Sequence, residues 1–159
     1  MRRLLPLLLV LSACGSGGGD LCARFYAPYP NMIGERPRTR TNAALLDAMA
    51  AYDQGDYATA AVGLSAVIER DANDRMARLQ LASALIGAGE PYKAEMHLDF
   101  LERVPGAPFK DQTEWMNALC WLCSGQNARA LGQCRIIAQR PAHTYGSEAQ
   151  ALAKALESQ

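Results

Sequence analysis

Few residues in this sequence are of types that could do chemistry, and the most suggestive are two cysteines. Cys120 and Cys123 have the two-residue gap that thiol-redox and zinc motifs share. They fall within a predicted helix, are followed by Ser124 rather than by the histidine of a haem-attachment motif, and have no second pair of this spacing to complete a zinc site. We therefore expect neither zinc nor haem here, and a thiol-redox protein using this pair is the weakest of the functions considered.

Other catalytic groups are sparse. His97 and His143 are the only histidines, and the sequence has no Gly-x-Ser-x-Gly motif, no phosphate-binding loop and no acidic cluster with metal-ligand spacing. The sixteen basic and sixteen acidic residues cancel, and no run of like charge indicates nucleic acid. The sequence therefore predicts a protein that is not an enzyme, with no cofactor, no metal and no nucleic-acid partner.

The N-terminal residues are typical of an export signal. Two arginines precede an apolar run over residues 4–11, which is too short to cross a bilayer, since a span needs about 20 apolar residues. The run ends in Leu11-Ser12-Ala13-Cys14, which closely resembles the lipobox of bacterial lipoproteins. The resemblance implies cleavage before Cys14 and lipid attachment to it. The alternative is an ordinary signal peptide, because small residues also precede ordinary cleavage sites.

A glycine-rich stretch over 15–19 follows and is expected to be a flexible tether. Gly15 is not the aspartate that commonly retains lipoproteins at the inner membrane, so the resemblance implies an outer-membrane anchor facing the periplasm. We divide the chain into a signal peptide (1–13), a lipidated tether with an extended proline and aromatic segment (14–40), and a helical domain (41–159).

The helices that must position any site repeat themselves after Thr41. Gly55, Gly89 and Gly125 lie 34 (89 minus 55) and 36 (125 minus 89) residues apart, each with an alanine seven residues before it and another five after it. A glycine can close a tight turn between two helices, and alanines let the helix backbones approach closely. The spacing predicts three helical hairpins, followed by a capping helix over about 147–157.

This framework of small residues resembles the tetratricopeptide repeat, as do the stretches 53–57 and 81–85. The resemblance covers about Thr41 to the C-terminus. It implies an all-α fold, in which about three hairpins and a C-terminal capping helix form a right-handed superhelical stack, and it implies a role in protein binding. The first copy departs from the pattern, because Ala51 stands where a large residue is usual.

A second apolar stripe runs along the first helix of each hairpin, although packing within the stack already uses the alanine face. The resemblance implies that this stripe lines a concave groove for peptides or partner helices. Neighbouring hairpins, or the chain's own apolar segment 25–33, are the alternative covers, and we hypothesise that this segment docks on or beside the groove. The predicted groove residues are Leu45, Met49, Tyr52, Leu79, Ile86, Trp115, Leu119 and Leu122.

Exported proteins can keep disulfides, and four cysteines remain if Cys14 is lipidated. Cys120 and Cys134 fit the role of small buried apolar residues. Cys123, near the end of its helix, is the better candidate for a bridge to Cys22.

We therefore expect a membrane-anchored adaptor or scaffold that binds a partner protein or peptide through the apolar groove. The alternative is a structural subunit of an outer-membrane or envelope assembly, in which the outer helices or the cap form the interface. The sequence does not identify the partner.

Overall fold

A computed structural model describes residues 17–106 and 109–159. Within these residues the chain forms helices and no strand, so the all-α prediction is confirmed. The predicted signal peptide (1–13) and the predicted lipid site, Cys14, lie outside the described residues. The helices are α1 (Gly17–Phe25), α2 (Ala43–Asp53), α3 (Tyr57–Arg70), α4 (Arg75–Gly87), α5 (Pro91–Glu102), α6 (Lys110–Cys123), α7 (Asn127–Ala138) and α8 (Gly146–Glu157).

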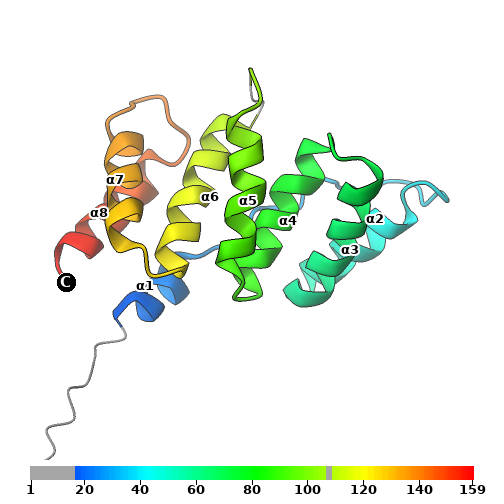
Figure 1. The fold of residues 1–159 in the computed structure, drawn as a ribbon, viewed down its shortest axis with the longest axis horizontal. Coiled ribbons are helices and arrows are strands. Elements are labelled where there is room, and N and C mark those ends of the chain that lie inside the picture. The colour runs from blue at the N-terminus through cyan, green and yellow to red at the C-terminus, as the bar shows by residue number, and fades with distance from the viewer. Residues whose placement is uncertain (1–16, 107–108) are drawn as a thin grey trace, which may run out of the picture.

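Helices α2 to α8 follow one another in a row, and each packs against the next in chain order (Figure 1). Three of the connections are the glycine turns that the repeat predicts. Gly55, Gly89 and Gly125 follow α2, α4 and α6 with φ of +77°, +77° and +75°, a left-handed conformation that favours glycine. The near-constant spacing of these turns gives three hairpins of similar size, α2–α3, α4–α5 and α6–α7.

Small side chains set the distance between paired helices. Ala60, Ala94 and Ala130, the alanines five residues after each turn, are fully buried. Helices α2 and α3 approach closely, and a Cβ added at Gly63 would lie 2.7 Å from the Cβ of Ala48. Larger apolar side chains fill the interior between the helices, so one continuous core runs the length of the row.

Helix α8 closes the end of the row against α7. It begins at Gly146, one residue before the expected start. Its buried side chains all lie on one face, whereas the polar residues of the helix lie on the other. The buried residues are Ala149, Leu152, Ala153 and Leu156.

The expectation of a flexible glycine-rich tether is wrong for residues 17–19, which form the start of α1. Glycine disfavours helices, but tertiary packing outweighs this preference here: Leu21 is buried in the core, and α1 packs beside α6. After α1 the chain runs extended along the row of helices to reach α2 at the opposite end (Figure 1). No helix in the described ranges has the length and apolarity that crossing a membrane requires.

Candidate functional site

The residues predicted to line an open groove are buried in this structure. They lie on α2, α4 and α6 as expected, but seven of the eight have exposures of only 0–7%, and Leu45 is partly buried. A partner could reach them only if another part of the chain moved away. The predicted groove residues are therefore not accessible in this arrangement.

The cover over α2 and α4 is the chain's own N-terminal segment, residues 21–33. The Tyr29 N–H donates to the Ser83 hydroxyl oxygen at 2.9 Å, and the Tyr52 hydroxyl donates to the Tyr29 carbonyl at 2.7 Å. The Gln80 side-chain amide donates to the Pro30 carbonyl at 2.6 Å. Because these bonds satisfy backbone groups of an extended strand-like segment, the segment occupies the groove as a bound peptide would.

Ser83 is the centre of this contact and was absent from the predicted site. Its carbonyl accepts a 2.8 Å hydrogen bond from the Tyr26 hydroxyl. Its own hydroxyl is free to donate to the Tyr52 oxygen, 2.6 Å away. The signal in the sequence was a serine in a stripe that is otherwise apolar, since a buried hydroxyl needs a partner.

Docking of the N-terminal segment should be visible in the alkaline titration of two tyrosines. Burial raises the pKa of Tyr26 to about 12 and also raises the pKa of Tyr52. Both hydroxyls therefore hold their protons more tightly in the folded chain than in the unfolded chain. Their contribution to stability is fully present below the unfolded pKa of about 10. The contribution of Tyr26 is lost as the pH rises through about 12.

Replacing Tyr26 with phenylalanine should accordingly remove tyrosinate absorbance from the part of the titration near pH 12. The spectrum would be followed on the intact folded chain, with the wild-type protein titrated in parallel. If the variant instead lost tyrosinate absorbance near the ordinary tyrosine pKa of about 10, the hydroxyl of Tyr26 would face water. That result would contradict the docked arrangement.

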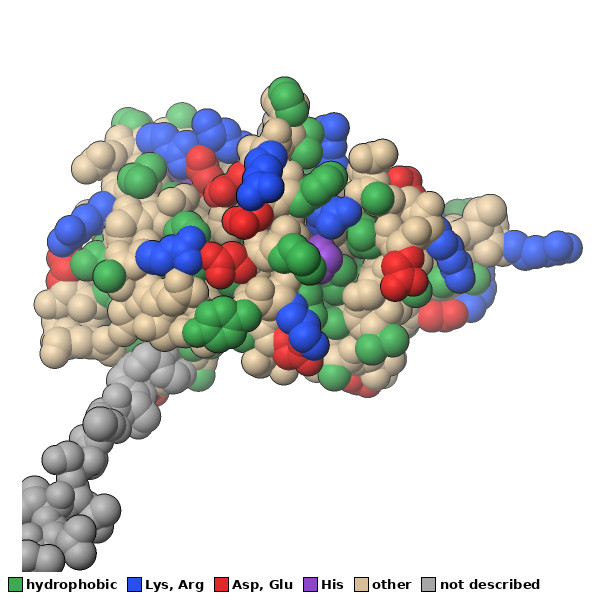
Figure 2. All heavy atoms as spheres, viewed as in Figure 1, with side chains coloured by type: hydrophobic (Ala, Val, Ile, Leu, Met, Phe, Trp, Pro, Cys, Tyr) green, Lys and Arg blue, Asp and Glu red, His purple; other side chains and the backbone are tan. Residues whose placement is uncertain are grey.

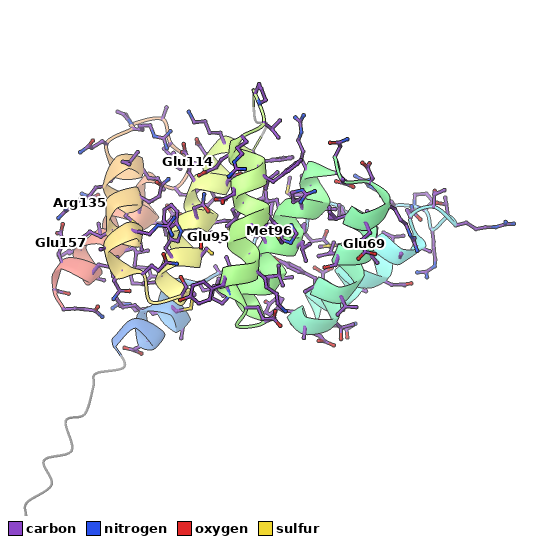
Figure 3. The ribbon with its side chains drawn as sticks, viewed as in Figure 1. Glu69, Glu95, Met96, Glu114, Arg135 and Glu157 are labelled. Carbon is purple, nitrogen blue, oxygen red and sulfur yellow. A yellow bond between two sulfur atoms is a disulfide. The ribbon has the colours of Figure 1, made fainter. Side chains whose placement is uncertain are left out.

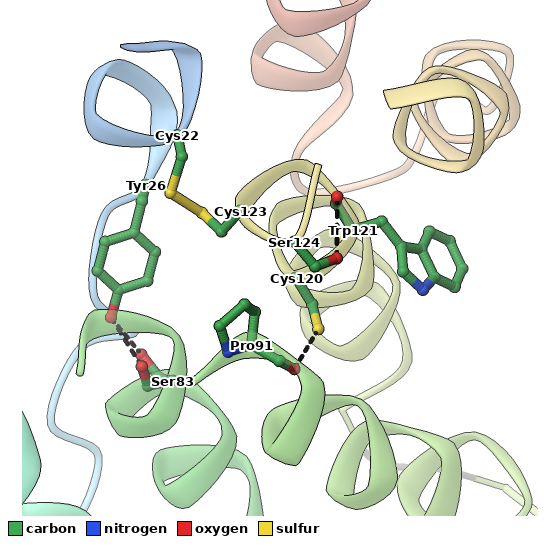
Figure 4. The surroundings of a disulfide bond; sticks show 8 residues. All are labelled: Cys22, Tyr26, Ser83, Pro91, Cys120, Trp121, Cys123 and Ser124. Atoms are coloured by element: carbon green, nitrogen blue, oxygen red, sulfur yellow. Dashed lines mark hydrogen bonds between the residues drawn. A yellow bond between two sulfur atoms is a disulfide. The ribbon is translucent and has the colours of Figure 1, made fainter. Parts of the chain in front are cut away.

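A disulfide fastens the N-terminal segment at its start (Figure 4). It joins Cys22 on α1 to Cys123, the last residue of α6, and this is the pair that the sequence favoured.

Cys120 stays a free buried thiol, which donates to the Pro91 carbonyl at 2.9 Å. Burial raises the pKa of the Cys120 thiol, and likewise that of Cys134, to about 12. Cys120 and Cys123 therefore do not form a dithiol pair here, and neither free cysteine is a ready nucleophile at neutral pH.

Near the start of α6 lies a polar cluster in which a ring nitrogen and two carboxylates could be taken for a metal site. Ligand atoms of Asp111, Glu114 and His143 all lie within 4.8 Å of one another. However, Arg140 forms an ion pair with Glu114, and the Tyr145 N–H donates to His143 Nδ1 at 3.1 Å. This bond places the ring proton on Nε2, which donates to Glu114 Oε2 at 3.0 Å. In this arrangement Nε2 has no lone pair for a metal.

The same cluster has a structural role, because it ties the α7–α8 connection to α6. Asp111 accepts from the Thr144 N–H at 2.8 Å, which lowers the pKa of its carboxyl. Trp115, one of the predicted groove residues, stacks on Tyr145 with ring centroids 5.7 Å apart. The connection before α8 therefore covers Trp115, as the N-terminal segment covers Tyr52.

Four of the five large exposed apolar side chains in the described ranges lie on α3, α5 and α7, and the fifth, Met32, lies in the N-terminal segment. Figure 2 shows hydrophobic side chains scattered over the face formed by α3, α5 and α7. Among the described residues on these helices, the large exposed apolar side chains are Val62, Tyr92, Met96 and Ile136.

Fold and surfaces together define an all-α helical-repeat protein whose inner groove is closed by its own chain. No family model, curated protein or solved structure matches this sequence.

Proposed function

We propose that this protein is an adaptor of the bacterial cell envelope that binds a partner protein through the outer face of a tetratricopeptide-like stack. In this proposal, Cys14 carries the lipid and residues 1–13 are removed, so that the domain is held at the outer membrane facing the periplasm. The lipobox-like Leu11-Ser12-Ala13-Cys14 supports the anchor. The repeating hairpins support an interaction role, because stacked helices present large surfaces for partners.

One observation carries the choice of face: the groove is already filled by the N-terminal segment, whereas four of the five large exposed apolar side chains in the described ranges lie on the outer helices. Single exposed apolar residues are common. Here, however, they occur on α3, α5 and α7, which lie along one face of the molecule (Figures 1 and 2). The same observation favours the second candidate, a structural subunit of an envelope assembly, whose interface would also be the outer helices.

Site-specific photo-crosslinking in cells tests this choice. A photoreactive residue at Met96, which is 65% exposed on α5, should give a discrete crosslinked product with a partner. The same residue at Leu45, which is partly buried on the groove side, should give none. Strong crosslinking from Leu45 and none from Met96 would show that the partner binds in the groove and would overturn the proposal.

The two candidates differ in how permanently the partner is bound. For a structural subunit, the partner crosslinked at Met96 should also co-purify in fixed proportion without crosslinking. For an adaptor, the partner should be lost on washing.

Replacing Cys14 with serine should release either form from the membrane, and a variant that stays fully membrane-bound would contradict the lipid anchor.

A further inference from the structure

Arg78 on α4 carries a buried charge that no carboxylate of the described chain neutralises. Its residue exposure is 8%, and among the residues that the structure describes it is the only buried arginine or lysine. Every ion pair found in the described ranges involves other residues. A buried charge without a counter-ion is costly, and burial accordingly lowers the pKa of Arg78.

The contacts of this guanidinium use only part of its hydrogen-bonding capacity. One Nη donates to the Ala72 carbonyl at 2.6 Å, and the other lies 3.2 Å from Nδ1 of His97. Its carbon lies 3.9 Å from the centre of the Phe100 ring, a cation–π contact. An arginine has five N–H donors, and its Nε is buried here without any partner.

Two hollows meet beside this charge on the outer face. Arg78 lines the first, of about 510 Å³, which runs along the exposed side of α5. The second, of about 320 Å³, lies between α3 and α5 and has Ile68, Leu81 and Leu85 among its lining residues. Met96 lines both hollows, and Figure 3 shows it on the same side of the molecule as Glu69 of α3.

Most of the other charges around the hollows are already paired. Arg103 pairs with Asp99, Lys93 with Glu90 and Arg129 with Glu95. Glu69 is the exposed acid on the α3 wall of the smaller hollow. The larger hollow therefore has one charge without a local counter-ion, that of Arg78, beside an apolar depression.

We propose that these two hollows form the partner-binding site, and that the partner places the carboxylate of an aspartate or glutamate on Arg78 and an adjacent large apolar side chain between α3 and α5. The inference rests on the proposed function, since it names the chemistry of a partner on the outer face. Charge complementarity selects an acidic peptide. The two Nη atoms of Arg78 carry four N–H groups, of which the contacts with Ala72 and His97 use two. A carboxylate in the hollow that Arg78 lines would accept from the remaining Nη groups and neutralise the cation.

The test uses the chain without its predicted signal peptide (1–13) and a library of random linear peptides displayed without free C-termini. Selected peptides should share an Asp or Glu next to a large apolar residue. Changing that acid to its amide should weaken binding about ten- to hundred-fold, the effect of losing a charged hydrogen bond. Selection of peptides with no acidic preference would overturn the proposal.

Variants of the protein locate the site. Met96→Glu should abolish binding, because it puts a negative charge and a polar group between the hollows. Ile136→Glu is the matched control, since Ile136 is exposed on α7 outside both hollows, and it should leave binding unchanged. If Met96→Glu still bound the peptides and Ile136→Glu did not, the assignment of the binding site to the two hollows would be refuted.

Arg78 already has intramolecular contacts, so a cycle of paired changes separates recognition from packing. In the Arg78→Gln protein, changing the acid of the peptide to its amide should no longer weaken binding. If that change costs as much in Arg78→Gln as in the wild type, Arg78 only supports the fold and the proposal fails. That failure would leave a crosslink at Met96 intact, whereas absence of any crosslink there would count against the proposed function itself.

Discussion

Replacing Cys22 and Cys123 together with serine should lower the free energy of unfolding by about 2–5 kcal/mol, the usual effect of removing a native disulfide. The bond spans a sequence separation of 101 residues, and closing so long a loop restricts the unfolded chain strongly. It also holds α1 against α6, so its loss weakens the hold on the segment that fills the groove. Urea denaturation of the two proteins measures the difference.

Reduction of the wild-type protein by a dithiol supplies the control. The reduced wild type should unfold at the same urea concentration as the double serine variant, which should itself be insensitive to the dithiol. Binding of a hydrophobic dye should rise in both, because the inner faces of α2, α4 and α6 become exposed when the segment leaves. Equal stability of the oxidised wild type and the variant would show that the cross-link does not constrain the fold.

The second large effect is expected at Gly63, where α3 passes close to α2. In Gly63→Ala the new Cβ would lie 2.7 Å from the Cβ of Ala48 and 3.3 Å from its Cα. The helices must therefore move apart, and we expect a loss of about 1–3 kcal/mol, as for other overpacked cores. Thermal and urea unfolding followed by circular dichroism measure this loss.

Gly132 on α7 is the matched control, because a Cβ there meets nothing within 4 Å. Gly132→Ala should stabilise the protein by about 0.5–1 kcal/mol, since alanine is the better helix former. The two substitutions are chemically identical and should have opposite signs. A stabilising effect at Gly63 would mean that α2 and α3 do not approach as closely as described.

The parts of the fold that the sequence predicted are those with a local signal. The turn glycines and their flanking alanines fix the helix boundaries, because a left-handed turn and a close helix contact each demand a particular small residue. Helix α1 was missed for the opposite reason. Its glycines favour a flexible chain, and the contacts that hold it against the domain, the burial of Leu21 and the bond from Cys22 to α6, are far away in the sequence.

The candidate site was predicted less completely, because its state depends on contacts far apart in the sequence. The apolar stripe indicated correctly that something covers α2, α4 and α6. Whether the cover is a partner or the chain itself depends on bonds such as that from Tyr29 to Ser83, which are 54 residues apart. Arg78 gave no signal at all, since an arginine in a helix is ordinarily solvated and its burial arises only when α5 packs beside α4.

The position of the cross-link also determines how mechanical load would travel. Tension on the chain before Cys22 enters the domain at Cys123 on α6, and α6 packs directly on α5. A pull between a membrane anchor and a protein held on α5 would thus cross a single helix interface. The residues after Cys22 that fill the groove lie outside this path, so traction on the partner would not pull directly on them.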